Sequence, residues 1–137
     1  MKIQYSTNPD QYSRMNTDEL RETYLVDELF QKDEINLNYY FVDRTIIGTA
    51  VPDKKSLQLT APQKLLAAEY FTERRELGVF NIGGDGTISV DGTDHELSKT
   101  ELLYIGRGNK DIQFKNSGSG DAPRFYFVSF PAHHDYP

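Results

Sequence analysis

The chain has 137 residues, no cysteine and a formal net charge of -6. This length predicts one domain that can bury a core by itself, and the lack of cysteine excludes disulfides, thiolate catalysis and cysteine zinc sites. The acidic charge disfavours nucleic acid and anionic membranes as partners, while no apolar run approaches the about 20 residues that span a bilayer. The N-terminus lacks the apolar core of a signal peptide, so we expect a cytoplasmic protein.

The first third of the chain carries few regular patterns. Residues 1–16 are polar and aperiodic, and we interpret them as an N-terminal extension. Thr17 is followed by two acidic residues, a pattern that predicts the N-cap and first turn of a short helix ending near Thr23. The apolar residues within 24–30 favour a strand.

From residue 35 onward, short apolar runs alternate with turn residues. The segment 62–70 fits either one helical turn or an extended edge, and Asp91-Gly92 is a strong hairpin signal. The expected strands cover 36–42, 44–51, 57–59, 79–82, 87–90, a short run ending at 97, 102–105, 112–114 and 125–130. Many short strands separated by glycine turns predict an antiparallel sandwich or barrel.

Three segments carry a family resemblance: YFTERRELGVFNIGGDGTISVDG, LLYIGRGNKDIQF and PRFYFVSFPAHHDYP. Together they resemble the N-terminal half of the 5-keto-4-deoxyuronate isomerases, also named 4-deoxy-L-threo-5-hexosulose-uronate ketol-isomerases. The resemblance implies an all-β fold, a cupin-type double-stranded jelly roll with one short N-terminal helix. It also implies that residues 1–137 form a single degenerate cupin domain, and that the family's second, catalytic cupin is absent from this chain.

The same resemblance implies an activity and its partners. The family interconverts 5-dehydro-4-deoxy-D-glucuronate and 3-deoxy-D-glycero-2,5-hexodiulosonate in the breakdown of pectin and uronates. Its zinc lies in the C-terminal cupin, so no cofactor is expected in this chain. A homo-oligomer or a partner cupin domain is expected, with a uronate-derived small molecule bound in the full enzyme.

The family's metal motif has the form HxHERRxE with a later histidine, and aligning its ERR with residues 73–75 shows what replaces each ligand. Tyr70 and Thr72 stand where the two histidines would be, Leu77 replaces the carboxylate, and the later histidine falls near Asn109. These are poor ligands, since zinc and iron sites need three or four good donors. The resemblance therefore implies neither metal ligands nor catalytic residues in this chain.

The charged run at 73–76 has two interpretations. The first is a charged strand edge whose members pair across strands or across a subunit contact, an arrangement worth only about 0 to 1 kcal/mol for exposed pairs. The second assigns Arg74, Arg75 and Tyr70 to substrate binding, because the planar guanidinium group matches a carboxylate.

Three histidines remain as weaker candidates. His95 is expected at the surface, and adjacent His133 and His134 point to opposite faces of an extended chain, which prevents joint chelation. The resemblance includes His133 and suggests that it packs or forms a hydrogen bond structurally. The aromatic run 125–130 is either core or a contact face.

An alternative to the enzyme half stays open, and the sequence alone leaves enzymatic activity undecided. A stand-alone, non-catalytic cupin module would bind a sugar acid or a partner chain. A third class, a metal-dependent dioxygenase-type cupin acting alone, is disfavoured by the four aligned positions, and bound zinc or iron there would overturn that argument.

Overall fold

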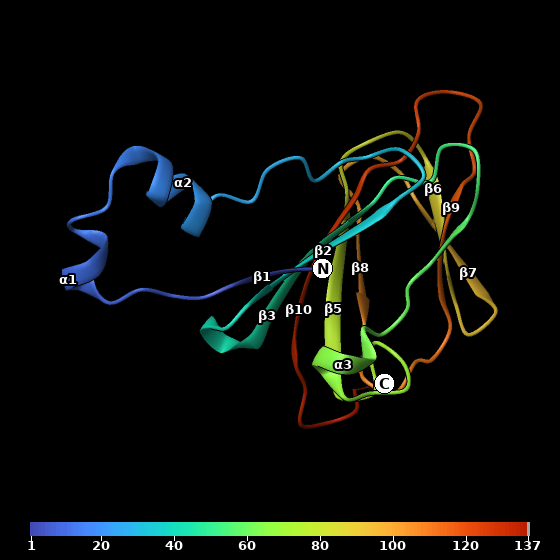
Figure 1. The fold of residues 1–137 in the computed structure, drawn as a ribbon. Helices are drawn as coiled ribbons and strands as arrows, with labels where there is room; N and C mark the ends of the chain where they lie inside the picture. Colours follow the sequence, from blue (N-terminus) through green and yellow to red (C-terminus); the bar gives the residue numbers. More distant parts are fainter. Residues whose placement is uncertain (137) are drawn as a thin grey trace.

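Two β-sheets pack face to face in the computed structural model, which describes residues 1–136 (Figure 1). The larger sheet has the order β1 (Lys2–Gln4), β2 (Ile35–Tyr40), β3 (Thr45–Ala50), β10 (Phe125–Pro131), β5 (Arg75–Asn81) and β8 (Leu102–Ile105). The smaller sheet has the order β4 (Leu57–Gln58), β9 (Ile112–Asn116), β6 (Gly86–Val90) and β7 (Thr93–Leu97). All pairings are antiparallel except β1 with β2.

The strand order identifies the architecture. Counted from β3 to β10, the larger sheet holds the first, eighth, third and sixth strands, and the smaller sheet holds the second, seventh, fourth and fifth. This interleaving of two four-stranded sheets is the double-stranded jelly roll that cupins share. The predicted fold class is confirmed.

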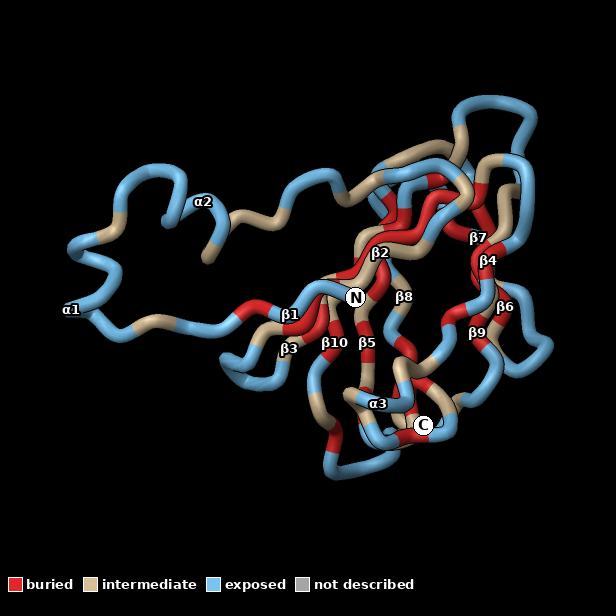
Figure 2. The backbone as a smooth tube through the Cα atoms, viewed as in Figure 1, coloured by how far each residue is buried: buried red, intermediate tan, exposed pale blue. Residues whose placement is uncertain are grey.

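The core lies between the sheets, where the strands alternate between buried and more exposed residues (Figure 2). This period of two places every second side chain on the inner face of a sheet. In β10, Phe125 and Phe127 are fully buried, and Phe114 from β9 stacks on Phe127 with ring centroids 5.7 Å apart. Aromatic contacts between the two sheets therefore form the centre of the core.

An N-terminal arm extends away from the sandwich (Figure 1). It carries α1 (Pro9–Tyr12) and α2 (Thr17–Tyr24), neither of which has a buried residue. The predicted short helix is α2, but its cap is Asn16, whose side chain accepts a hydrogen bond from Glu19 N in a capping box. The predicted cap at Thr17 is wrong because Asn16, one residue earlier, caps Glu19 N and Thr17 is already the first helical residue.

The predicted strand at 24–30 is wrong. This segment enters no strand ladder, and side chains from the larger sheet hold it instead: Asn36 Nδ2 donates to the Leu29 carbonyl at 2.9 Å, and the Thr49 hydroxyl donates to the same oxygen. Its apolar residues had suggested a strand, but they have no partner strand to pair with.

Two short helical segments connect the strands near one end of the sandwich. The open alternative at 62–70 resolves to α3 (Gln63–Leu66), a single turn. The 3-10 turn η1 (Val42–Arg44) joins β2 to β3. Within residues 1–136, no helix is both long and apolar enough to cross a membrane.

Candidate functional site

The positions that align with the family's metal ligands do lie together. Thr72 is fully buried, and its hydroxyl donates to the Asn109 carbonyl. Tyr70 lies beside Lys110, the residue that follows Asn109: the Lys110 Nζ is 5.7 Å from the centroid of the Tyr70 ring. Leu77 is 1% exposed in the core. The fold therefore brings Thr72 and Asn109 into contact and Tyr70 close to them, whereas the aligned side chains are hydroxyl, amide, phenol and hydrocarbon.

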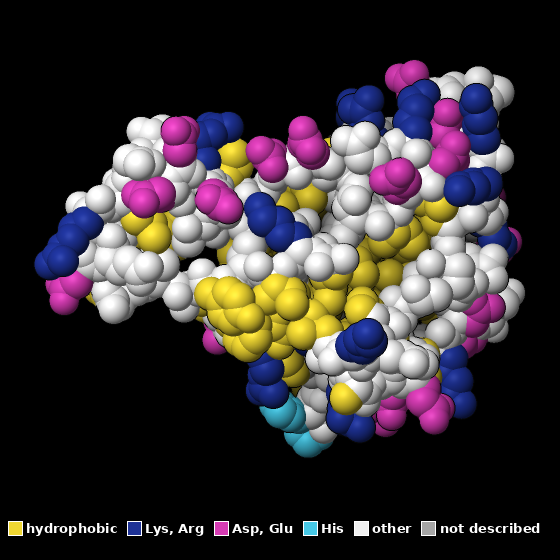
Figure 3. Space-filling view, in the orientation of Figure 1, with side chains coloured by type: hydrophobic (Ala, Val, Ile, Leu, Met, Phe, Trp, Pro, Cys, Tyr) yellow, Lys and Arg dark blue, Asp and Glu magenta, His cyan; other side chains and the backbone are white. Residues whose placement is uncertain are grey.

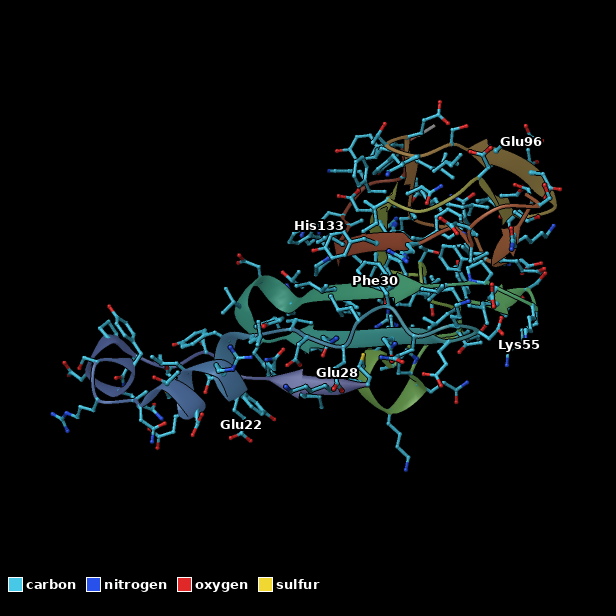
Figure 4. The ribbon with its side chains drawn as sticks, turned by 90° about the horizontal axis from the view of Figure 1, so that it is seen from above. Glu22, Glu28, Phe30, Lys55, Glu96 and His133 are labelled. Carbon is cyan, nitrogen blue, oxygen red and sulfur yellow. The ribbon has the colours of Figure 1, made fainter. Side chains whose placement is uncertain are left out.

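No other group of side chains in residues 1–136 offers a metal site, since no three His, Asp or Glu side chains cluster there. His95 lies half-buried in β7, on the opposite sheet from β10. His133 and His134 are exposed just beyond β10, where Figure 4 labels His133. His133 is therefore not packed into this domain. Pro137, which belongs to the resemblance, lies outside the described residues.

Arg75 is the most unusual charged residue in the sandwich. It opens β5 and points to the inner face, where it is only 6% exposed. Its Nε donates to Ser129 Oγ at 3.0 Å, and its Nη2 donates to the carbonyl oxygens of Ser129 at 2.8 Å and Arg44 at 2.6 Å. The charged-edge interpretation is therefore wrong for Arg75, whereas Arg74 is exposed but forms no ion pair with a described residue.

The environment of Arg75 disfavours its positive charge. Burial is the main reason that the pKa of Arg75 falls to about 10; Tyr39 opposes the fall, and the neighbouring Arg44 adds to it. The hydrogen bonds of Arg75 go to neutral oxygens, which solvate the guanidinium group without neutralising it.

The acidic residues of the charged run turn elsewhere. Glu73 accepts a hydrogen bond from the backbone N of Glu69 at 2.7 Å, and Glu76 accepts one from the Tyr104 hydroxyl at 2.7 Å. The Tyr104 contact joins neighbouring strands β5 and β8 and raises the pKa of Tyr104 to about 12. Neither carboxylate forms an ion pair with Arg75.

A cavity of 210 Å³ lies against Arg75 at one end of the sandwich. Arg44 and Arg74 add two further guanidinium groups to its wall. The remaining wall is mostly apolar and comes from β2, α3, the segment after α3 and the end of β10: Tyr39, Leu65, Leu66, Ala68, Phe71 and Pro131. Figure 3 shows hydrophobic side chains gathered at the surface over the end of the β2–β3 hairpin, beside α3.

The backbone at η1 is arranged around this cavity. Asp43 and Arg44 have φ values of 52° and 51°, in the left-handed region that residues with a Cβ seldom adopt. In this conformation the Arg44 carbonyl accepts the hydrogen bond from Arg75 Nη2. The chain therefore holds two arginines next to each other at the cavity wall.

The sequence predicted part of this site. Arg74 and Arg75 were candidates and do share the cavity, whereas Tyr70 is not among its lining residues. Arg44 was not among the candidates and was missed as a cavity residue. No local pattern marks it, because Arg44 lies in the η1 turn with a positive φ, before the alternating residues of β3 begin at Thr45.

A larger depression of 570 Å³ lies between the glycine turns at 83–85 and 118–121. It is lined mainly by turn residues together with the side chains of Lys99 and Arg124, both exposed. It contains no buried charged side chain, so the arginine cavity is the stronger candidate site.

Comparison with known proteins identifies clear relatives. The 4-deoxy-L-threo-5-hexosulose-uronate ketol-isomerase of Halalkalibacterium halodurans is 46% identical over 137 residues, 100% of this chain and 49% of the relative. The enzymes of that name from Lachnoclostridium phytofermentans and Formosa agariphila are 46% and 45% identical, over 100% and 97% of this chain and 49% and 47% of their own lengths. The chain thus spans about half the length of the curated relatives it matches.

No family model matches the chain. Among solved structures, a cupin protein from Bacteroides fragilis matches with a TM-score of 0.48 and 16% identity, over 68% of this chain and 72% of that one. The EutQ protein of Clostridium difficile matches with a TM-score of 0.46 and 22% identity, over 72% of this chain and 63% of that one. The fold assignment rests on the strand order. From its first residue to its last, the chain is homologous to about half of the 4-deoxy-L-threo-5-hexosulose-uronate ketol-isomerases.

Proposed function

We propose that this chain is the N-terminal half of a 4-deoxy-L-threo-5-hexosulose-uronate ketol-isomerase, and that this half is structural rather than catalytic. The proposed enzyme interconverts 5-dehydro-4-deoxy-D-glucuronate and 3-deoxy-D-glycero-2,5-hexodiulosonate during uronate breakdown in the cytoplasm. The observation that carries the proposal is the 46% identity that extends over 100% of this chain but only 49% of the relative.

The donor set supports the structural role. The family's zinc does not fit the positions that a cupin would use, because Thr72 and Leu77 are buried and committed to internal packing. Tyr70 and Asn109 offer a phenol and an amide, which do not make a zinc site without histidine or carboxylate partners. In this proposal the zinc and the proton-transferring base belong to the other half of the enzyme.

The outer face of the larger sheet supports a contact with that other half or with a second subunit. Leu102, Tyr104 and Phe130 project from this face and are 65%, 46% and 44% exposed. In the aromatic run 125–130, alternate residues face the core, and the others are available on this outer surface for the proposed contact. We therefore propose that this face contacts a partner cupin domain or another subunit of a homo-oligomer.

The test measures ketol-isomerase turnover and retained metal on the 137-residue chain, with and without added zinc. The full-length Halalkalibacterium halodurans relative serves as the positive control. We expect turnover and tightly held zinc in the full-length relative, and neither of them in the 137-residue chain. Zinc-dependent turnover by the 137-residue chain would contradict the structural role and return His95, His133 and His134 to consideration as donors.

A further inference from the structure

The arginine cavity holds positive charge that the described residues do not neutralise. Ion pairs within residues 1–136 join Lys32 to Asp53, Arg107 to Asp135 and Lys115 to Asp94. None of them involves Arg44, Arg74 or Arg75. A buried charge normally has a partner of opposite sign, since an unpaired charge is costly to remove from water.

One edge of the Arg75 guanidinium group is free to meet a ligand. Nε and Nη2 are committed to Ser129 and to the Arg44 carbonyl, whereas Nη1 makes no hydrogen bond to any described residue. Nη1 therefore keeps some access to solvent, because within residues 1–136 the only fully buried side-chain atom without a hydrogen-bond partner is Gln4 Oε1. Arg75 lines the cavity, and we place its free Nη1 N–H groups toward that space.

We propose that this cavity is a binding site for a small organic monocarboxylate. The carboxylate accepts hydrogen bonds from Arg75 Nη1, and the exposed Arg44 and Arg74 close over it from the cavity wall. Guanidinium groups suit this role because their N–H groups match the planar, two-oxygen geometry of a carboxylate. The body of the ligand packs on the apolar wall formed by Leu65, Leu66 and Phe71.

The size of the cavity limits the ligand. A volume of 210 Å³ has room for about seven water molecules at roughly 30 Å³ each. That space suits an acid of a few carbon atoms and is too small to enclose a nucleotide. Buried hydrogen-bonding contacts hold Arg75 in place before any ligand arrives, so little ordering is needed on binding.

This inference does not depend on the proposed isomerase, since it involves neither zinc nor turnover. The alternative occupant is the Asp or Glu side chain of a partner protein, which carries the same carboxylate group. Such a side chain would fill the cavity and prevent a free carboxylate from entering, which makes the two occupants distinguishable.

The test is an NMR titration of the full 137-residue chain with sodium propionate, observing backbone amides and the Arg75 Nε–H signal. Propionamide is the matched neutral ligand, because it has the same shape without the charge, and inorganic phosphate is the second anion. The inference expects saturable propionate shifts at Arg75, Leu65 and Phe71, with propionamide and phosphate binding more weakly.

Variants at the exposed arginines complete the test without removing the buried one. Arg44→Gln and Arg74→Gln should each weaken propionate binding by roughly tenfold, the typical effect of losing a charge-assisted hydrogen bond. Arg21→Gln, on the distant α2, is the control and should leave the affinity unchanged. Equal binding of propionate and propionamide, tighter binding of phosphate, no binding of propionate, or unchanged affinity in both cavity variants would overturn the proposal.

Discussion

Arg75 lies in the core because of its place in the strand, and the letters of the charged run do not reveal this. It pairs with Pro131 across β5 and β10, two residues before Leu77 on the same buried face. Arg74, one residue earlier, has the opposite orientation and is exposed. Because successive side chains point to opposite faces of a sheet, a difference of one position along the chain decides which arginine meets Ser129 and which meets solvent.

The contacts of Arg75 predict a specific mutational effect. Arg75→Lys should destabilise the domain by about 2 to 3 kcal/mol, since lysine keeps the charge but cannot reproduce the fork that reaches Ser129 and the Arg44 carbonyl. Urea unfolding measures the change. Arg74→Lys is the matched control and should stay within about 0.5 kcal/mol. Equal stability of the two variants would contradict the structural role of Arg75.

Asp33 makes a second residue-level prediction, which concerns pH. Its Oδ1 accepts hydrogen bonds from the backbone N–H groups of Asp53, Lys54 and Lys55 at 3.0, 2.8 and 3.2 Å. The bond from Lys54 is the largest cause of the lowered pKa of Asp33.

A lowered folded-state pKa means that the carboxylate stabilises the fold above its unfolded pKa. The stabilisation is lost as the pH falls through the folded-state value, which lies below 3.8. Asp33→Asn should therefore lower the Tm at neutral pH, and the gap to the original chain should narrow well below pH 3.8. Thermal unfolding followed by circular dichroism across this range measures the gap. A gap that stays constant with pH would argue against a role for the charged form.

Among the elements, β3 shows how closely the sheets fit around their aromatic core. A Cβ added at Gly48 would lie 2.2 Å from Phe127 Cε2 and 2.9 Å from Leu37 Cδ2. Gly78 in β5 meets nothing within 4 Å on the other face of the same sheet. The space beside Gly48 therefore excludes a larger side chain, whereas the space beside Gly78 can admit one.

This contrast predicts opposite outcomes for the same substitution. Gly48→Ala should destabilise the domain by about 1 to 3 kcal/mol, because the ring of Phe127 must move to admit the methyl group. Gly78→Ala should be neutral or slightly stabilising, since alanine restricts the unfolded chain more than glycine does. Chemical denaturation of both variants measures the difference, and a larger loss for Gly78→Ala would contradict the packing described for β3.

Strands were easier to predict than the segments between them. Alternation and glycine turns are local signals, and they located most strands of both sheets. The start of β5 was missed because charges at 73–76 resemble a solvated edge, although Arg75 is buried. The segment 24–30 failed for the opposite reason: its composition favours a strand, but side chains of Asn36 and Thr49 hold its backbone at Leu29.

At the scale of the whole molecule, the jelly roll gathers residues that no local pattern connects. The cavity combines Arg44 before β3, Arg75 in β5 and the apolar residues of α3, which are distant in sequence. Arg74 and Arg75 could be suggested from their residue type alone. Arg44 could not, because its role depends on the pairing of β3 with β10 and on the left-handed turn before it.

The jelly roll also explains how a cupin can keep its shape without its metal. Thr72 and Asn109 still meet where ligands would converge, but they form a hydrogen bond, and Leu77 fills the adjacent core. Hydrophobic packing here replaces the cross-link that a metal would provide. Under the proposed function, this packing maintains the fold of the chain while the chemistry resides in the other half of the enzyme.

The most direct test of the account is the turnover of a chimera in which this chain replaces the matching half of the Halalkalibacterium halodurans ketol-isomerase. The alignment covers the whole chain, so the junction falls at its end. The account predicts a zinc-loaded chimera with turnover comparable to the parent enzyme, because the exchanged half contributes no metal ligand. A chimera that folds and retains zinc but lacks turnover would contradict the assignment of this chain as that half.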